Sequence, residues 1–147
     1  MAFEFVLAPL LRLRQSVERQ LMLTLQETAL RLARERENVA RLDRFLIDAE
    51  KVDADSLLGG RASAELRFAE SQREELWRLR VRMQAEVARL AALREQAADA
   101  YQSAFREREV LDSLCARQRR AYEVDKLRRE QRRLDAAFLL QRWHRRG

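Results

Sequence analysis

The chain has 147 residues, of which 47% are hydrophobic and 37% are charged, and its formal net charge is +6. It contains one cysteine and one histidine, and its three glycines include a single adjacent pair, which excludes an internal disulfide, a cysteine–histidine zinc site and a glycine-rich phosphate loop. With so few glycines and a single proline, the chain can make few turns. The composition predicts an all-α protein that is not an enzyme and binds no cofactor or metal.

The first helix is expected over about residues 8–56. Pro9 suits the first turn of a helix, because its missing N–H would have no partner there. Apolar residues then follow three, four or seven positions apart, which places them on one face of a helix. The seven-residue step is plain in the row Leu25, Leu32, Val39 and Leu46.

A turn is expected over about residues 57–62, where Gly59 and Gly60 stand side by side. A glycine directly after a helix can adopt the left-handed conformation that ends it. Ser63 can then cap the helix that follows. A connection this short makes the two helices antiparallel neighbours, with residues facing each other where their numbers add up to about 119.

The second helix is expected over about residues 63–143, with two rows at the seven-residue spacing of a coiled coil. One row consists of Leu76, Met83, Leu90, Ala97, Ala104 and Leu111. The other consists of Leu79, Leu93, Ala100, Leu114 and Ala121, with Glu86 and Glu107 as interruptions. The predicted fold is therefore one long two-helix antiparallel coiled-coil hairpin over residues 1–147.

The two arms of this hairpin are unequal, so the second helix overhangs at the C-terminus. Pro9 falls opposite about residue 110, which leaves about 30 residues, or about 45 Å of helix, beyond the first arm. The overhang carries an apolar stripe of its own, formed by Val124, Leu127, Leu134 and Phe138. Such a stripe predicts docking to a partner. The alternatives are that the overhang frays or that the segment from Phe3 to Leu7 folds along part of it.

The positive charge is concentrated at the C-terminal end. Residues 116–147 hold 11 Lys and Arg against 4 Asp and Glu, whereas residues 1–115 hold 19 against 20. This end complements the negative end of a helix dipole, and it also predicts a basic docking surface. The basic residues between Arg117 and Arg133 are spread around the helix without a base-reading fold. Specific nucleic-acid recognition is therefore not expected, and nonspecific binding at low salt is an alternative.

The remaining reactive side chains have unremarkable settings. Cys115 follows Leu114 and is expected to be a small apolar filler, and His144 is expected at the surface.

Glu4 precedes a short apolar run that does not fit a signal peptide, and no stretch approaches the roughly 20 apolar residues of a membrane span. A single free cysteine is typical of a reducing compartment, so we expect a cytoplasmic protein.

Three motifs resemble the FliJ family of flagellar export proteins. They are F-x-F-x-L at residues 3–7 followed by LLRLR at 10–14, the Gly-Gly tip, and EQRRLD at 130–135 before an aromatic-apolar end. The resemblance implies a non-enzymatic stalk of the flagellar type III export apparatus that inserts into a hexameric export ATPase, reaches the membrane export-gate protein and escorts export chaperones. It also implies a cytoplasmic protein peripherally associated with the inner-membrane apparatus. A stalk of a virulence secretion system is the nearest alternative.

The resemblance assigns different partners to the two ends. The ATPase is expected to dock where both termini lie, on Phe3, Phe5, Leu7, Leu11, Leu127, Arg128, Leu134 and Phe138. The export gate is expected to contact a surface nearer the tip, on Leu42, Phe45, Phe68, Gln72, Leu76 and Leu79. Phe45 and Phe68 lie off the core rows and should be exposed, whereas the three leucines can instead belong to the seam between the helices. A stalk should be monomeric alone, while the rival interpretation, a basic coiled-coil scaffold, would self-associate.

Overall fold

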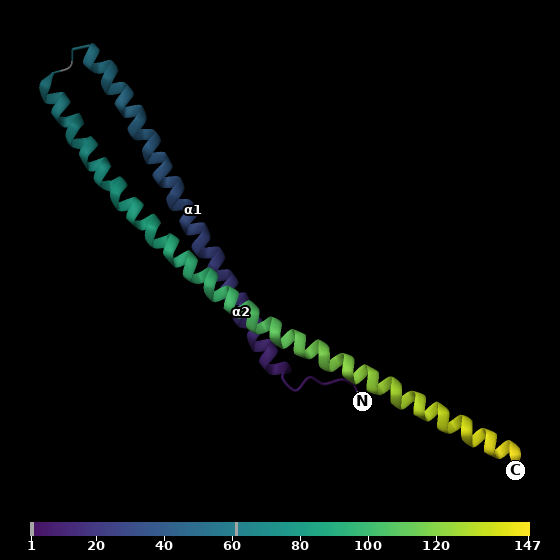
Figure 1. Cartoon of the computed structure of the whole chain (residues 1–147). Coiled ribbons are helices and arrows are strands. Elements are labelled where there is room, and N and C mark those ends of the chain that lie inside the picture. Colours follow the sequence, from purple (N-terminus) through teal and green to yellow (C-terminus); the bar gives the residue numbers. More distant parts are fainter. Residues whose placement is uncertain (1, 61) are drawn as a thin grey trace. The chain divides into compact units, whose positions relative to one another are not determined.

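The computed structural model describes residues 2–60 and 62–147, apart from the side chains of Ser56 and Leu57. Two helices of unequal length, α1 (Ala8–Leu58, 51 residues) and α2 (Ser63–Arg146, 84 residues), make up nearly all of it (Figure 1). The described residues contain no strand, which confirms the predicted all-α class. Two compact units are described in turn: a tip unit of residues 20–101, and a terminal unit of residues 1–19 and 102–147.

The tip unit is an antiparallel helical hairpin. α1 ends at Leu58, two residues beyond the expected boundary, and Gly59 and Gly60 follow it (Figure 1). Gly60 has a φ of +78°, the left-handed conformation that costs glycine little. The left-handed residue is therefore the second glycine after α1, and not the one directly after it as the sequence predicted. Arg61, which the predicted turn also includes, lies outside the described residues.

The two helices of the tip unit bury a narrow seam. Its most buried leucines are Leu32, Leu46 and Leu90, which are 3%, 5% and 5% exposed. Leu32 and Leu46 belong to the seven-residue row predicted on α1, and Leu90 belongs to the first row predicted on α2. Burying these leucines removes hydrocarbon from water, which stabilises the seam.

The second row of α2 differs in part from the prediction: Ala100 and Leu114 are half-buried as expected, but its leucines in the tip unit are not. Leu79 and Leu93 are 38% and 37% exposed, so they lie at the edge of the seam rather than in it. The row that is half-buried against α1 in this unit consists of Leu66, Arg73, Arg80, Val87 and Tyr101.

Ion pairs across the seam explain this difference. Arg73 pairs with Asp53, and Arg80 pairs with Asp43. An arginine can cover apolar surface with its aliphatic stem while its guanidinium reaches a carboxylate, so it can occupy a position that a leucine would otherwise take. The residue numbers of the two pairs add up to 126 and 123, so the helices are shifted by a few residues from the expected register.

The terminal unit uses the same combination of apolar and charged contacts. Phe5 and Ala104 are 9% and 5% exposed. Nε of Arg108 donates a hydrogen bond to Glu18 at 2.5 Å, and its Nη1 donates to Asp112 at 2.5 Å. Arg108 lies seven residues before Cys115 in the row that faces α1, so a charged residue again occupies a seam position.

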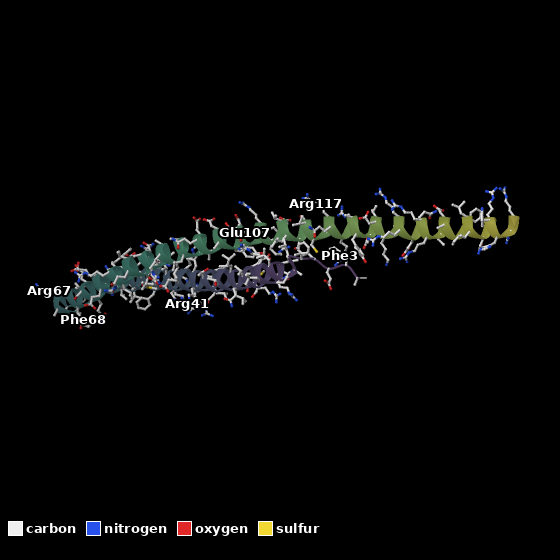
Figure 2. All side chains as sticks on the ribbon, turned by 90° about the horizontal axis from the view of Figure 1, so that it is seen from below. Phe3, Arg41, Arg67, Phe68, Glu107 and Arg117 are labelled. Carbon is white, nitrogen blue, oxygen red and sulfur yellow. The ribbon has the colours of Figure 1, made fainter. Side chains whose placement is uncertain are left out.

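Residues 2–7, which precede α1 in the sequence, run alongside α2 and are called the N-terminal strap below. The ring of Phe3 lies 5.7 Å from that of Tyr122, between centroids, and the guanidinium carbon of Arg119 lies 5.5 Å from the Phe3 ring centroid (Figure 2). The strap thus follows α2 as far as Tyr122, which is the second of the two alternatives that the sequence left open. Every residue from Glu123 to Gly147 is exposed, and α2 continues to Arg146.

Candidate partner-docking surfaces

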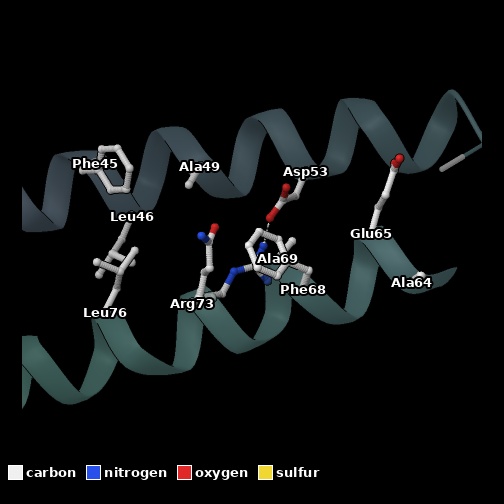
Figure 3. Close-up of a pocket in the computed structure, with 11 residues that line it drawn as sticks. Phe45, Leu46, Ala49, Asp53, Ala64, Glu65, Phe68, Ala69, Arg73 and Leu76 are labelled. Atoms are coloured by element: carbon white, nitrogen blue, oxygen red, sulfur yellow. Dashed lines mark hydrogen bonds and ion pairs between the residues drawn. The ribbon is translucent and has the colours of Figure 1, made fainter. Parts of the chain in front are cut away.

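The tip unit contains an open groove of about 530 Å³ between α1 and α2, called the tip groove below (Figure 3). It is lined by Phe45, Leu46, Ala49, Asp53, Ala64, Glu65, Phe68, Ala69, Gln72, Arg73 and Leu76. The two helices contribute residues from both sides of the seam. The groove is therefore a feature of the paired helices and not of either helix alone.

Small side chains create the hollow. Ala49 on α1 and Ala69 on α2 are half-buried lining residues, and each stands seven residues from a leucine in its row, Leu42 and Leu76 respectively. A methyl group leaves space that a leucine would fill. Phe45 and Phe68 also line the groove, with 58% and 66% of their surfaces exposed. The Asp53–Arg73 ion pair spans the helices beside Phe68 (Figure 3).

The tip groove contains four of the six residues expected to contact an export gate. Phe45, Phe68, Gln72 and Leu76 line it, and the two phenylalanines are exposed as the sequence predicted. Leu42 is instead half-buried in the seam, and Leu79 lies outside the groove. Sequence reasoning missed the two alanines, because their role depends on how the helices are aligned.

The sequence around the tip groove is acidic. Residues 43–76 hold nine Asp and Glu against five Lys and Arg, a net charge of −4. Glu65 and Asp53 line the groove itself, and Asp53 is neutralised by its pair with Arg73. The net charge of a region contributes to the potential that an approaching partner meets.

The second candidate surface is the C-terminal segment, residues 123–147, in the terminal unit. Its apolar stripe is largely in contact with solvent: Leu127, Leu134 and Phe138 are 65%, 65% and 63% exposed. At 3.6 residues per turn, these side chains lie about 120–160° around α2 from Tyr122, the last half-buried residue of the seam row. The stripe is therefore not a continuation of the seam.

Basic residues occupy the other side of this segment. By the same helical spacing, Lys126, Arg129 and Arg133 fall on the face that continues the seam, and all three are exposed. Up to Phe138 the apolar stripe thus lies opposite these three basic residues, whereas Arg128 and Arg132 lie between the two sides and Leu140 falls on the basic side. Figure 2 shows nitrogen-tipped side chains along the segment. Sequence reasoning did not single out three exposed apolar residues at its end, Leu139, Leu140 and Trp143, although the step of four from Leu139 to Trp143 marks one face.

The eight residues expected to dock an ATPase do not form one surface. Phe5 is buried and Phe3 is covered by Tyr122 and Arg119, so both serve to hold the strap. Leu11 is half-buried, and Leu7 is 37% exposed. The remaining four, Leu127, Arg128, Leu134 and Phe138, are exposed in the C-terminal segment.

The charged groups of the seam act as structural pairs. The hydrogen bond to Glu18, and then that to Asp112, raises the pKa of Arg108, and the hydrogen bond to Asp43 raises the pKa of Arg80. Arginine is already protonated at any physiological pH, so these shifts create no proton donor or acceptor.

Within residues 2–60 and 62–147, no three potential metal ligands gather in one place. No helix in the described part of the chain has a stretch long and apolar enough to cross a bilayer. Cys115 is half-buried and His144 is exposed.

Comparison with known families gives a match over almost the whole chain. The family model described as "Flagellar FliJ protein" matches residues 3–147 and so covers the strap, both helices and the C-terminal segment. Comparisons with curated proteins and with solved structures found no match.

Proposed function

The chain belongs to the flagellar FliJ family, whose members are non-catalytic components of flagellar protein export, and we propose that it acts there as a stalk between two partners. The C-terminal segment docks into the hexameric export ATPase. The tip groove contacts the membrane export-gate protein. The protein also escorts empty export chaperones and works at the cytoplasmic side of the membrane that holds the apparatus.

The exposed stripe of Leu127, Leu134 and Phe138 is the observation that carries this proposal. Fully burying such a side chain stabilises a complex by about 1.5–3 kcal/mol, and each of these is about two-thirds exposed. A partner that covered them would therefore gain about 1–2 kcal/mol from each. A regular stripe of this kind on a single helix is the pattern of an anchor for a groove in another protein.

The two faces of the C-terminal segment support a role inside a ring. Six identical subunits around one helix cannot all meet the same face, so some meet Leu134 and others meet Arg129 or Arg133. Different contacts stabilise different conformations of otherwise equal subunits. A two-faced stalk can therefore promote turnover of an ATPase without taking part in its chemistry.

The tip groove supports the second contact. It presents Phe45 and Phe68, which are more than half exposed, beside the hollow over Ala49 and Ala69. Exposed aromatic rings around a pocket are typical of the central anchors of protein–protein interfaces.

Two leucines of equal exposure provide the test. Leu134 and Leu139 are 65% and 63% exposed but lie about 140° apart around α2. Leu134→Glu should weaken binding to the export ATPase about tenfold or more, whereas Leu139→Glu should bind within about twofold of the unchanged protein. Binding is measured with purified ATPase, and circular dichroism checks that both variants keep their helix. Equal binding by the two variants would contradict the assignment of the stripe.

A further inference from the structure

We infer that the tip groove is a socket for one bulky apolar side chain from a partner helix that carries lysine or arginine beside that anchor. The inference rests on the proposed function in that it takes the tip groove to be the surface that meets the export gate. It goes further by stating the chemistry of the segment that binds. It also names the two alanines as the residues that select for it.

The shape of the groove favours a single large anchor. Its volume of about 530 Å³ lies over Ala49 and Ala69, and the exposed rings of Phe45 and Phe68 border it (Figure 3). Leu46, which is 5% exposed, lines the groove where the seam closes again. An apolar side chain entering this hollow would contact aromatic and aliphatic carbon on several sides, as an interface hot spot does.

The groove also favours a helical partner. It runs between two antiparallel helices, where side chains from both border a hole at the seam. Such holes accept a side chain from a further helix in the knobs-into-holes manner of coiled coils. The backbone groups of both helices are already satisfied within the helices, so they offer no edge for an added strand.

Charge selects among helical partners. The tip carries a net charge of −4 over residues 43–76, and Glu65 lines the groove itself. A helix with Lys or Arg flanking its apolar anchor is attracted to this surface, and an acidic one is repelled. The C-terminal segment of a second copy, with its arginines and its stripe, has similar chemistry, but under the proposed function that segment is occupied by the export ATPase. We therefore assign the groove to a foreign helix.

Two synthetic helices about five turns long serve as probes, one of leucine and lysine and one of leucine and glutamate. Each is labelled with a fluorophore and titrated with the full chain, and anisotropy reports binding. The lysine helix should bind more weakly as salt rises, and Ala69→Leu should weaken its binding, whereas any binding of the glutamate helix to the basic C-terminal segment should be unchanged by Ala69→Leu. A glutamate helix that Ala69→Leu weakens as much as the lysine helix would overturn the charge argument.

Filling the hollow tests the socket. Ala69→Leu places three more carbons in the hollow of the tip groove and should weaken binding of the lysine helix about tenfold or more. Ala92→Leu makes the same change at an exposed position of α2 outside the groove and should leave binding unchanged. If Ala69→Leu alters the hairpin, Phe68→Ala replaces it, because Phe68 is 66% exposed and its removal leaves the seam intact. Binding that survives Ala69→Leu and Phe68→Ala would overturn the socket.

Purified export-gate protein separates this inference from the proposed function. If the gate binds the unchanged chain and Ala69→Leu equally well, the socket is wrong and the stalk function stands. If the gate does not bind but the lysine helix does, and Ala69→Leu weakens that helix, the socket stands and the gate assignment fails. Sedimentation of the chain alone provides the last comparison. A dimer that Ala69→Leu dissociates would overturn the choice of a foreign partner.

Discussion

Leu32→Ala probes the seam at its most buried side chain. Leu32 is 3% exposed, and its row on α1 continues to Val39 and Leu46. The substitution removes three carbons, and at about 0.8 kcal/mol for each buried carbon it loses about 2.4 kcal/mol of transfer free energy. A cavity adds to this cost, but a seam between only two helices can partly close over it, so the total should be about 2–3 kcal/mol.

Urea titration followed by far-ultraviolet circular dichroism measures this change in the free energy of unfolding. Leu30→Ala is the matched control, because Leu30 lies on the same helix and is 59% exposed. The control should change stability by less than about 0.5 kcal/mol. Equal shifts of the two midpoints would refute the assignment of the seam, because the two leucines differ in burial and not in chemistry.

The other two predictions concern the turn and the strap. Gly60→Ala should destabilise the tip unit by about 1 kcal/mol, because an added Cβ meets no atom within 4 Å and the whole cost is that of the φ of +78°. Gly59→Ala is its control, and thermal melting that ranked Gly59→Ala as the costlier change would contradict the account. Phe3→Ala removes the ring contacts with Tyr122 and Arg119, each of which contributes about 1 kcal/mol, so proteolysis within residues 2–7 should become at least about fivefold faster. Unchanged cleavage would mean that Phe3 does not hold the strap, and unchanged helicity is expected in either case.

Helical periodicity predicted most of the fold. Seven-residue spacing predicts both the α1 row through Leu32 and the α2 row through Leu90, and both of these leucines are buried. In the second row of α2, Arg80 takes the seam position expected of Leu79, whereas Ala100 and Leu114 are half-buried as predicted. In a coiled coil the second apolar row lies three or four residues after the first, so either Leu79 or Arg80 can follow Leu76. Hydrophobicity alone favours Leu79. Arg80 takes the seam position because it pairs with the carboxylate of Asp43. This pairing is a contact between the two helices, which hydrophobic spacing along one helix does not predict.

The candidate surfaces, too, were predictable only in part from the sequence. The exposure of Phe45 and Phe68 followed from their positions relative to the apolar rows, whereas the hollow beside them required the register of Ala49 against α2. The strap illustrates a different difficulty. Phe3 and Phe5 resemble free docking residues in the sequence, but the six residues ahead of α1, which include a turn at Val6 and Leu7, bring them against α2, where Phe5 is buried and Phe3 is half-buried. Local patterns predict which side chains are apolar, while tertiary contacts decide which of them are available.

The contacts between the paired helices of the tip unit do not depend on whether the two helices belong to the same chain. The ion pair of Asp53 with Arg73, and the leucines between the helices, would be equally satisfied if α1 of one molecule packed against α2 of another. Such domain swapping exchanges identical elements without loss of contacts. The tight bend at Gly59 and Gly60 opposes it, because a short connection keeps the two arms at a high effective concentration. A change that straightened this bend into continuous helix would thus favour intertwined dimers built from the same interface.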